Sequence, residues 1–177
     1  MNPSSRPPHD ASLWSDWSRV HGPAVRGYLL ATVRRPDLAD DLVQEVFFRA
    51  WKARSRYREE GSARAYLLRI ADHLVCDRAR RSGREVNVSE EDWRQIEPTQ
   101  RSQGPADALA QQEAVEQLAA ALDSLSPAQQ RVLLLRYYGG ISFSEIADIM
   151  GCPTSTALSH AHRGLLALRR LLVKTDQ

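Results

Sequence analysis

The stretch SPAQQRVLLLRYYGGISFSEIADIMGCPTSTALSHAHRGLLALRRLL, residues 126–172, has the pattern of a helix-turn-helix. Ser126 and Pro127 predict the start of one helix, because a serine side chain caps unpaired amides and proline fits the first helical turn. Ser142 and Glu145 have capping-box spacing, which predicts a second, short helix. These signals predict a group of packed helices near the C-terminus.

A further helix is expected from Thr154 to about Leu172. Its basic residues are Arg163, Arg169, Arg170 and Lys174, and no acidic residue occurs before Asp176. Such a charge bias suits a surface that faces phosphates, so DNA binding is the functional interpretation. A helical bundle with a solvated basic face is the alternative.

Composition limits the class of protein. A chain of 177 residues can hold one medium domain or two small ones, and its net charge of +2 is too small to coat DNA by charge alone. Neither a run approaching about 18 apolar residues nor an apolar signal core is present, so we expect a cytoplasmic protein. The cysteines, Cys76 and Cys152, have neither metal-ligand nor disulfide spacing.

The chain changes character several times along its length. Residues 1–11 are rich in Pro and Ser, which predicts a disordered tail, and residues 12–81 have helical patterning with few breakers. Residues 82–107 are acidic and then rich in Pro, Ser and Gln, which is typical of a linker, and helical periodicity returns over 108–174. No β-alternation appears. We therefore predict an all-α protein of two small helical domains joined by an acidic flexible linker.

The segment DLADDLVQEVFFRAWKA, residues 37–53, predicts an amphipathic helix with a broad apolar arc. Asp41, Gln44, Glu45 and Phe48 lie together on the opposite side of the helical wheel. A large aromatic beside two carboxylates and an amide is typical of a protein-docking patch. An ordinary solvated face remains open as the alternative.

The segment ARAYLLRIADHLVCDRARR, residues 63–81, predicts another amphipathic helix. One of its faces carries an aromatic side chain, a cysteine and several basic side chains at spacings of three or four. These residues are Tyr66, Arg69, His73, Cys76 and Arg80. Single-stranded nucleic acid needs such a face, because a ring stacks on bases while cations follow the backbone. A basic surface helix with Tyr66 half-buried is the alternative.

Taken in this order, the three segments resemble the extracytoplasmic-function (ECF, group IV) RNA polymerase sigma factors of the housekeeping-sigma superfamily. DDLVQEVFFRAW resembles their region 2.2, YLLRIADHLVCDRARR resembles regions 2.3 and 2.4, and the C-terminal segment resembles region 4. The resemblance covers roughly residues 20–81 and 108–172. It implies a subunit without catalysis or cofactor that binds core RNA polymerase through its β′ clamp and β subunits, directs it to promoters and helps to melt the -10 element.

The resemblance also implies a role for each matching residue. Those implied to bind the polymerase clamp are Asp41, Gln44, Glu45 and Phe48. Those implied to capture and hold the -10 element are Arg56, Tyr57, Arg58, Tyr66, Arg69, His73, Arg80 and Arg81. Those implied to read the -35 element in the major groove are Thr154, Ser155, Thr156, Ser159, His160 and Arg163. The linker 82–107 is implied to thread toward the polymerase active site.

The chain departs from the family pattern at four positions within these segments. Leu158 and His160 stand where Lys and Arg are common, which predicts weaker or altered -35 recognition; alternatively, Leu158 contacts a thymine methyl group. Tyr66 stands where Trp is common and His73 where Asn is common, so the -10 preference is expected to differ.

Two other classes of function stay open. One is a stand-alone helix-turn-helix regulator in which residues 12–81 dimerise or sense a signal. The other is a sigma-like decoy that sequesters an anti-sigma factor. An enzyme is not expected, because the sequence contains no P-loop, nucleophile elbow or zinc-protease helix, and its histidines have no metal-ligand spacing. An inhibitory anti-sigma partner is common in the family, and we treat such a partner as a hypothesis for this chain. We do not expect the chain to insert into a membrane.

Overall fold

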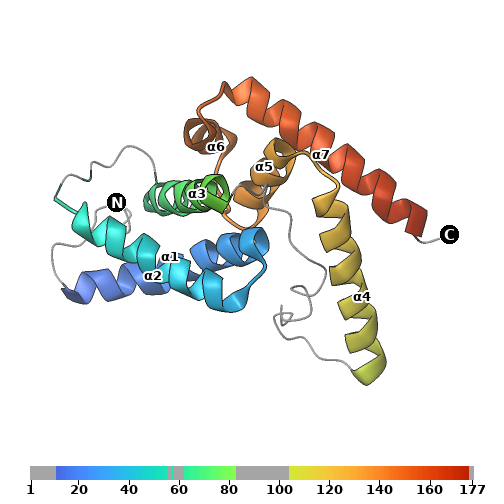
Figure 1. Cartoon of the computed structure of the whole chain (residues 1–177), viewed down its shortest axis with the longest axis horizontal. Coiled ribbons are helices and arrows are strands. Elements are labelled where there is room, and N and C mark those ends of the chain that lie inside the picture. Colours follow the sequence, from blue (N-terminus) through green and yellow to red (C-terminus); the bar gives the residue numbers. More distant parts are fainter. Residues whose placement is uncertain (1–10, 56, 58–61, 83–103, 176–177) are drawn as a thin grey trace.

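The computed structural model describes residues 11–55, 57, 62–82 and 104–175, and these residues form helices and short turns without a strand (Figure 1). The predicted all-α class is confirmed. The helices are α1 (Ala11–Val33), α2 (Pro36–Lys52), α3 (Ala63–Ser82), α4 (Gly104–Asp123), α5 (Pro127–Tyr137), α6 (Phe143–Met150) and α7 (Thr154–Thr175).

Helices α1, α2 and α3 pack against one another as the first helical unit. Helix α2 begins with Pro36, whose fixed φ suits a first turn, and places the acidic Asp37 there and the basic Arg49 and Lys52 in its last turn, as the helix dipole favours. Its buried face consists of Ala39, Leu42, Val46 and Ala50. The opposite, polar face is therefore presented to solvent.

Helices α4 to α7 form the second unit, and its predicted helix starts are confirmed. Ser126 and Ser142 each cap a helix through a complete capping box, with Gln129 and Glu145 as the reciprocal partners. Gly151 ends α6 at a φ of 64°, a left-handed conformation that glycine adopts without a steric penalty. Helix α4 begins at Gly104, inside the predicted linker range, because the following proline is compatible with a first helical turn.

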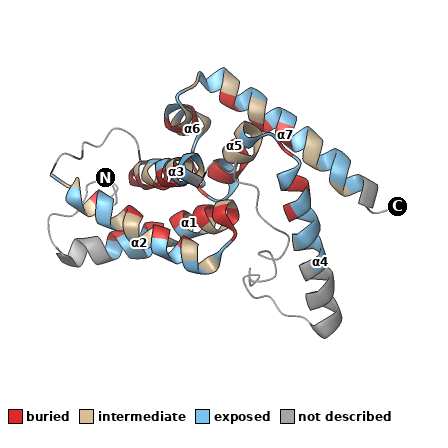
Figure 2. Cartoon of the chain, in the orientation of Figure 1, coloured by how far each residue is buried: buried red, intermediate tan, exposed pale blue. Residues whose placement is uncertain are grey.

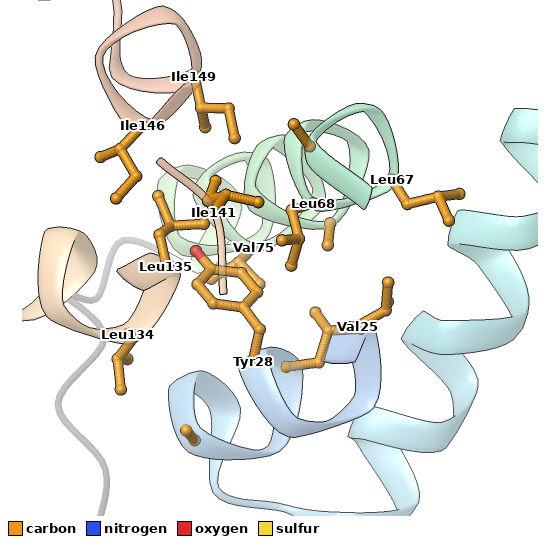
Figure 3. Packing of buried hydrophobic residues seen from close by; sticks show 14 of the residues in the cluster. Val25, Tyr28, Leu67, Leu68, Val75, Leu134, Leu135, Ile141, Ile146 and Ile149 are labelled. Atoms are coloured by element: carbon orange, nitrogen blue, oxygen red, sulfur yellow. The ribbon is translucent and has the colours of Figure 1, made fainter. Parts of the chain in front are cut away.

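The two units share one apolar core. Figure 3 shows Tyr28 of α1 and Leu68 of α3 beside Leu135 and Ile141 of the second unit, and all four side chains are fully buried. Buried residues concentrate where α1, α3 and α5 meet, whereas the outer faces of α2 and α7 are exposed (Figure 2). Two helical units are present as predicted, and in this structure they are packed together rather than held apart.

Candidate polymerase and promoter interfaces

The four residues predicted to bind polymerase lie on one exposed face of α2, which we call the α2 patch (Asp41, Gln44, Glu45 and Phe48). Phe48 is 54% exposed, which is unusual for a large aromatic ring. The Lys52 ammonium lies 5.1 Å from the centre of the Phe48 ring, and Arg49 Nε donates to Glu45 at 2.6 Å. The patch therefore combines carboxylates with an apolar ring on a rigid helix.

Tyr57 and Tyr66, both predicted to hold the -10 element, stack edge to face with ring centres 4.6 Å apart. Burial raises the pKa of the half-buried Tyr66 hydroxyl. The ring of Trp17 from α1 meets Tyr57 edge-on at 5.8 Å and completes the cluster. The sequence patterns did not single out Trp17, because it comes from a helix outside the segments that match the family motifs.

The basic side chains predicted on α3 are exposed, namely those of Arg69, His73, Arg80 and Arg81. Arg80 forms a solvent-exposed ion pair at 3.5 Å with Asp77, which lies one turn earlier, and such a pair stabilises the helix little. Cys76 on the same helix is half-buried, and burial followed by the nearby Asp72 carboxylate raises the pKa of its thiol. The predicted residues Arg56 and Arg58 lie outside the described residues.

Helix α7 presents the residues predicted to read the -35 element at its N-terminal end. Thr154, Ser155, Ser159 and Arg163 are exposed, while Thr156 and His160 are half-buried. On the opposite side, Gly164 allows α7 to approach α5, since a Cβ at this position would lie 3.0 Å from Leu133 Cδ1. Leu158 is 47% exposed and shares the outward surface with Ser155 and Ser159.

A buried polar network joins the two helical units, and the sequence patterns did not reveal it. Asp72 of α3 is 1% exposed and accepts hydrogen bonds from the Tyr28 hydroxyl at 2.8 Å and from Arg131 Nε of α5 at 2.6 Å. Burial and then the Asp72 charge raise the pKa of Tyr28 well above its ordinary value. Burial by itself would lower the pKa of Arg131, but the hydrogen bond and charge of Asp72 outweigh it and raise this pKa.

Two further contacts cross between the units. Arg34, which follows α1, forms an ion pair with Asp123 at the end of α4. The Glu145 carboxylate accepts hydrogen bonds from the Ser62 hydroxyl at 2.6 Å and from the Ser62 backbone amide at 3.3 Å. A charged residue at a core position of α3, Asp72 between Leu68 and Val75, was the one signal of this network in the sequence.

The fold is that of an all-α protein with a helix-turn-helix, and comparison with known proteins specifies its family. The family model for sigma-70 region 2 matches residues 18–85, and that for sigma-70 region 4 matches residues 115–168. The chain is 34% identical to the RNA polymerase sigma factor CarQ of Myxococcus xanthus, covering 86% of this chain and 84% of CarQ. It is 35% identical to the ECF sigma factor SigC of Mycobacterium tuberculosis, covering 73% and 68%.

Solved structures share the fold. The sigma factor RpoE of Bartonella quintana, in complex with the anti-sigma factor NepR, superposes with a TM-score of 0.73 at 24% identity, covering 94% of this chain and all of RpoE. CnrH, in complex with the cytosolic domain of CnrY, superposes with a TM-score of 0.69 at 21% identity, covering 96% and 92%.

The chain belongs to the ECF RNA polymerase sigma factors. It is a transcription-initiation subunit that binds core RNA polymerase and directs it to promoters. Membership of this family favours that function over the stand-alone regulator and the decoy. Within the described ranges no helix is long and apolar enough to cross a membrane. No group of three or more potential metal ligands gathers in the described part of the chain.

Proposed function

We propose that residues 12–81 act as the region 2 domain and residues 108–174 as the region 4 domain, connected by the linker 82–107. The α2 patch binds the β′ clamp of core polymerase. The observation that carries this proposal is the exposure of the Phe48 ring beside the carboxylates of Asp41 and Glu45, because a solvated face has no use for such a ring.

The aromatic pair of Tyr57 and Tyr66 is the proposed stacking surface for an unpaired base of the -10 element. Extruding a base costs a few kcal/mol, and stacking on an aromatic ring returns roughly 1–3 kcal/mol per base. The exposed cations Arg69, Arg80 and Arg81 then follow the backbone of the melted strand, and His73 supplies a hydrogen bond. Arg56 and Arg58 belong to the same proposed surface.

The N-terminal end of α7 is the proposed reading surface for the -35 element. Its polar side chains there are short, and Arg163 is the long cation of the set Thr154, Ser155, Thr156, Ser159, His160 and Arg163. The exposure of Leu158 supports contact with a thymine methyl group in the major groove. Recognition of the -35 element therefore relies more on apolar contact and less on cations than in family members with two additional basic residues here.

Region 4 also offers an apolar surface, formed by exposed leucines of α7 such as Leu165 and Leu166, that suits the polymerase β subunit. An anti-sigma protein is a further proposed partner, since RpoE and CnrH were solved with NepR and with the cytosolic domain of CnrY. The chain acts where RNA polymerase is found, in the cytoplasm. A binding screen of candidate anti-sigma proteins without a single complex would remove that partner.

Reconstitution of core polymerase with this chain, followed by transcription from fragments of its own genome, tests the proposed surfaces. The variant Asp41→Lys/Glu45→Lys is expected to lose polymerase binding and specific initiation. A matched control is Asp16→Lys/Glu113→Lys, because it changes the net charge equally at exposed positions of other helices. Equal polymerase binding by both folded variants would refute the role of the α2 patch.

A further inference from the structure

We propose that a cavity between α1, α3 and α5 is a binding site for a small, neutral aromatic molecule that carries one amide or hydroxyl group. The cavity has a volume of about 400 Å³, and small-molecule sites in proteins typically enclose about 300–1,000 Å³. Three of its lining residues, Tyr28, Val75 and Leu134, are labelled in Figure 3. None of the described residues that line the cavity belongs to the surfaces proposed for polymerase and promoter DNA.

The cavity runs from a buried floor to an exposed rim. Tyr28, Val75 and Leu134 are buried at the floor, whereas Asp123 and Pro127 are exposed at the rim. A ligand can therefore enter from solvent past the rim and place an apolar body against the buried side chains. Removal of that body from water is the driving force for binding.

The charged side chains around the cavity are already paired within the protein. Asp72 accepts hydrogen bonds from Arg131 through both of its oxygens, and Asp123 forms an ion pair with Arg34. A charged ligand would leave water without gaining a counter-charge, which is unfavourable. The electrostatics of the walls therefore select a neutral ligand.

Two titratable side chains in the walls are also held in their neutral forms. Burial and then the nearby Asp72 charge raise the pKa of the Tyr28 hydroxyl, and the same two causes raise the pKa of the Cys76 thiol. Both groups therefore stay uncharged at neutral pH. They present a hydroxyl and a soft sulfur atom to the cavity rather than additional charges.

The groups that line the cavity favour an aromatic ring over an aliphatic body of the same size. The Arg131 guanidinium is held in place by Asp72, and guanidinium groups pack favourably on the faces of aromatic rings. The Cys76 thiol is half-buried in the wall, and sulfur atoms also make favourable contacts with rings. An aliphatic ligand would gain neither of these two contacts.

Gln130 and Thr32 supply the polar contacts that would orient such a ring. The half-buried Gln130 side-chain amide forms no hydrogen bond with another described residue, so it can both donate to a ligand and accept from one. The Thr32 hydroxyl donates to the Tyr28 backbone carbonyl at 2.7 Å, which leaves its oxygen able to accept. One amide or hydroxyl on the ligand matches these two side chains.

Titration of the ¹⁵N-labelled full-length chain with benzamide, followed by NMR, tests the site. We expect a Kd of about 1–10 mM for so small a probe, with shifts of the Gln130 side-chain amide and the Cys76 backbone amide. Benzoate and benzamidine have the same shape but carry a negative and a positive charge, so they should bind roughly tenfold more weakly. The titration contains neither polymerase nor DNA, so its outcome does not depend on the proposed function.

Two variants locate the probe in the cavity. Gln130→Ala removes a hydrogen bond and should raise the benzamide Kd roughly 3–10-fold, while the control Gln117→Ala, at an exposed position of α4, should change it by less than about twofold. Cys76→Phe fills the cavity with a ring and should abolish binding at unchanged helical content; Gln130→Ala decides the test if that variant does not fold. No binding of benzamide, equal Kd values for its charged analogues, or a wild-type Kd in either folded variant would overturn the proposal.

Discussion

Asp72 shows how one side chain can join two parts of a molecule. Within the first helical unit it accepts a hydrogen bond from Tyr28, 44 positions earlier, and from the second unit it accepts hydrogen bonds from Arg131, 59 positions later. Its carboxylate is therefore satisfied only when both units are in place. Arg34 also joins the two units. Its left-handed backbone conformation costs roughly 1 kcal/mol, and its side chain forms an ion pair with Asp123 of the second unit.

Replacing Asp72 with Asn should strongly destabilise the folded protein. The amide keeps the size of the side chain and can still accept from Tyr28, but Arg131, at 27% exposure, loses its counter-charge. We expect the free energy of unfolding to fall by about 2–3 kcal/mol in urea denaturation. The control Asp16→Asn breaks an exposed ion pair with Arg19 and should change the unfolding free energy by less than about 1 kcal/mol. Equal effects of the two changes would contradict this account of Asp72.

Phe48→Ala tests the α2 patch without adding charge. Because the ring is more than half exposed, its removal should leave the melting temperature nearly unchanged. Loss of an aromatic anchor at a protein interface costs about 2 kcal/mol, so the Kd for core polymerase should rise roughly 30-fold. Titration of labelled protein with core polymerase measures this Kd. An unchanged Kd would place polymerase contact elsewhere on region 2.

At the scale of helices, α2 and the helix-turn-helix are the parts that the sequence predicted best. Their signals are local: the capping pairs of Ser126 and Ser142 and the apolar spacing of α2 act within a few residues. The contacts between the two units join residues far apart in the chain, such as Ser62 and Glu145, which are 83 positions apart, and no periodic pattern encodes them. The polar faces of the helices were therefore predictable from the sequence. The contacts that each helical unit makes with the other were not.

Helix α6 has a pH-dependent link to α3. Burial by itself would raise the pKa of Glu145, but the hydrogen bonds from Ser62 and Ser142 outweigh it and lower this pKa. The lowered pKa means that the bonded carboxylate stabilises the fold above the ordinary glutamate pKa, near 4.3, and that this contribution is lost as pH falls. Wild type should thus be more stable than Glu145→Gln at pH 7, and the difference should narrow toward pH 3.5. A constant difference would contradict this linkage.

Helix α7 offers a test of the proposed -35 reading surface. Leu158→Lys/His160→Arg introduces the two cations of the family pattern near the N-terminal end of this helix, one at an exposed and one at a half-buried position. Two added phosphate contacts should steepen the slope of log K against log salt concentration by about two units for -35 duplex binding by the holoenzyme. Titrations at several salt concentrations give this slope. An unchanged slope would mean that positions 158 and 160 do not face the DNA.

At the scale of the whole molecule, the structure combines two functional requirements that conflict. Recognition of two separate promoter elements needs the two units apart along DNA, whereas the structure buries a common core between them. Composition and motifs predicted both units, but the association between them depends on shape, as seen where Leu68 meets Gly139. We expect polymerase binding to exchange the contacts between the units for contacts with polymerase and DNA.

The most direct test measures the distance between the two units in the free protein and on polymerase. Dyes placed at the exposed positions Ser18 of α1 and Arg170 of α7, with Cys76 and Cys152 replaced by Ser, report this distance by single-molecule energy transfer. We predict high transfer in the free chain and low transfer after core polymerase and promoter DNA are added, with no change for Asp41→Lys/Glu45→Lys. The same transfer efficiency in the free and polymerase-bound states would contradict the account.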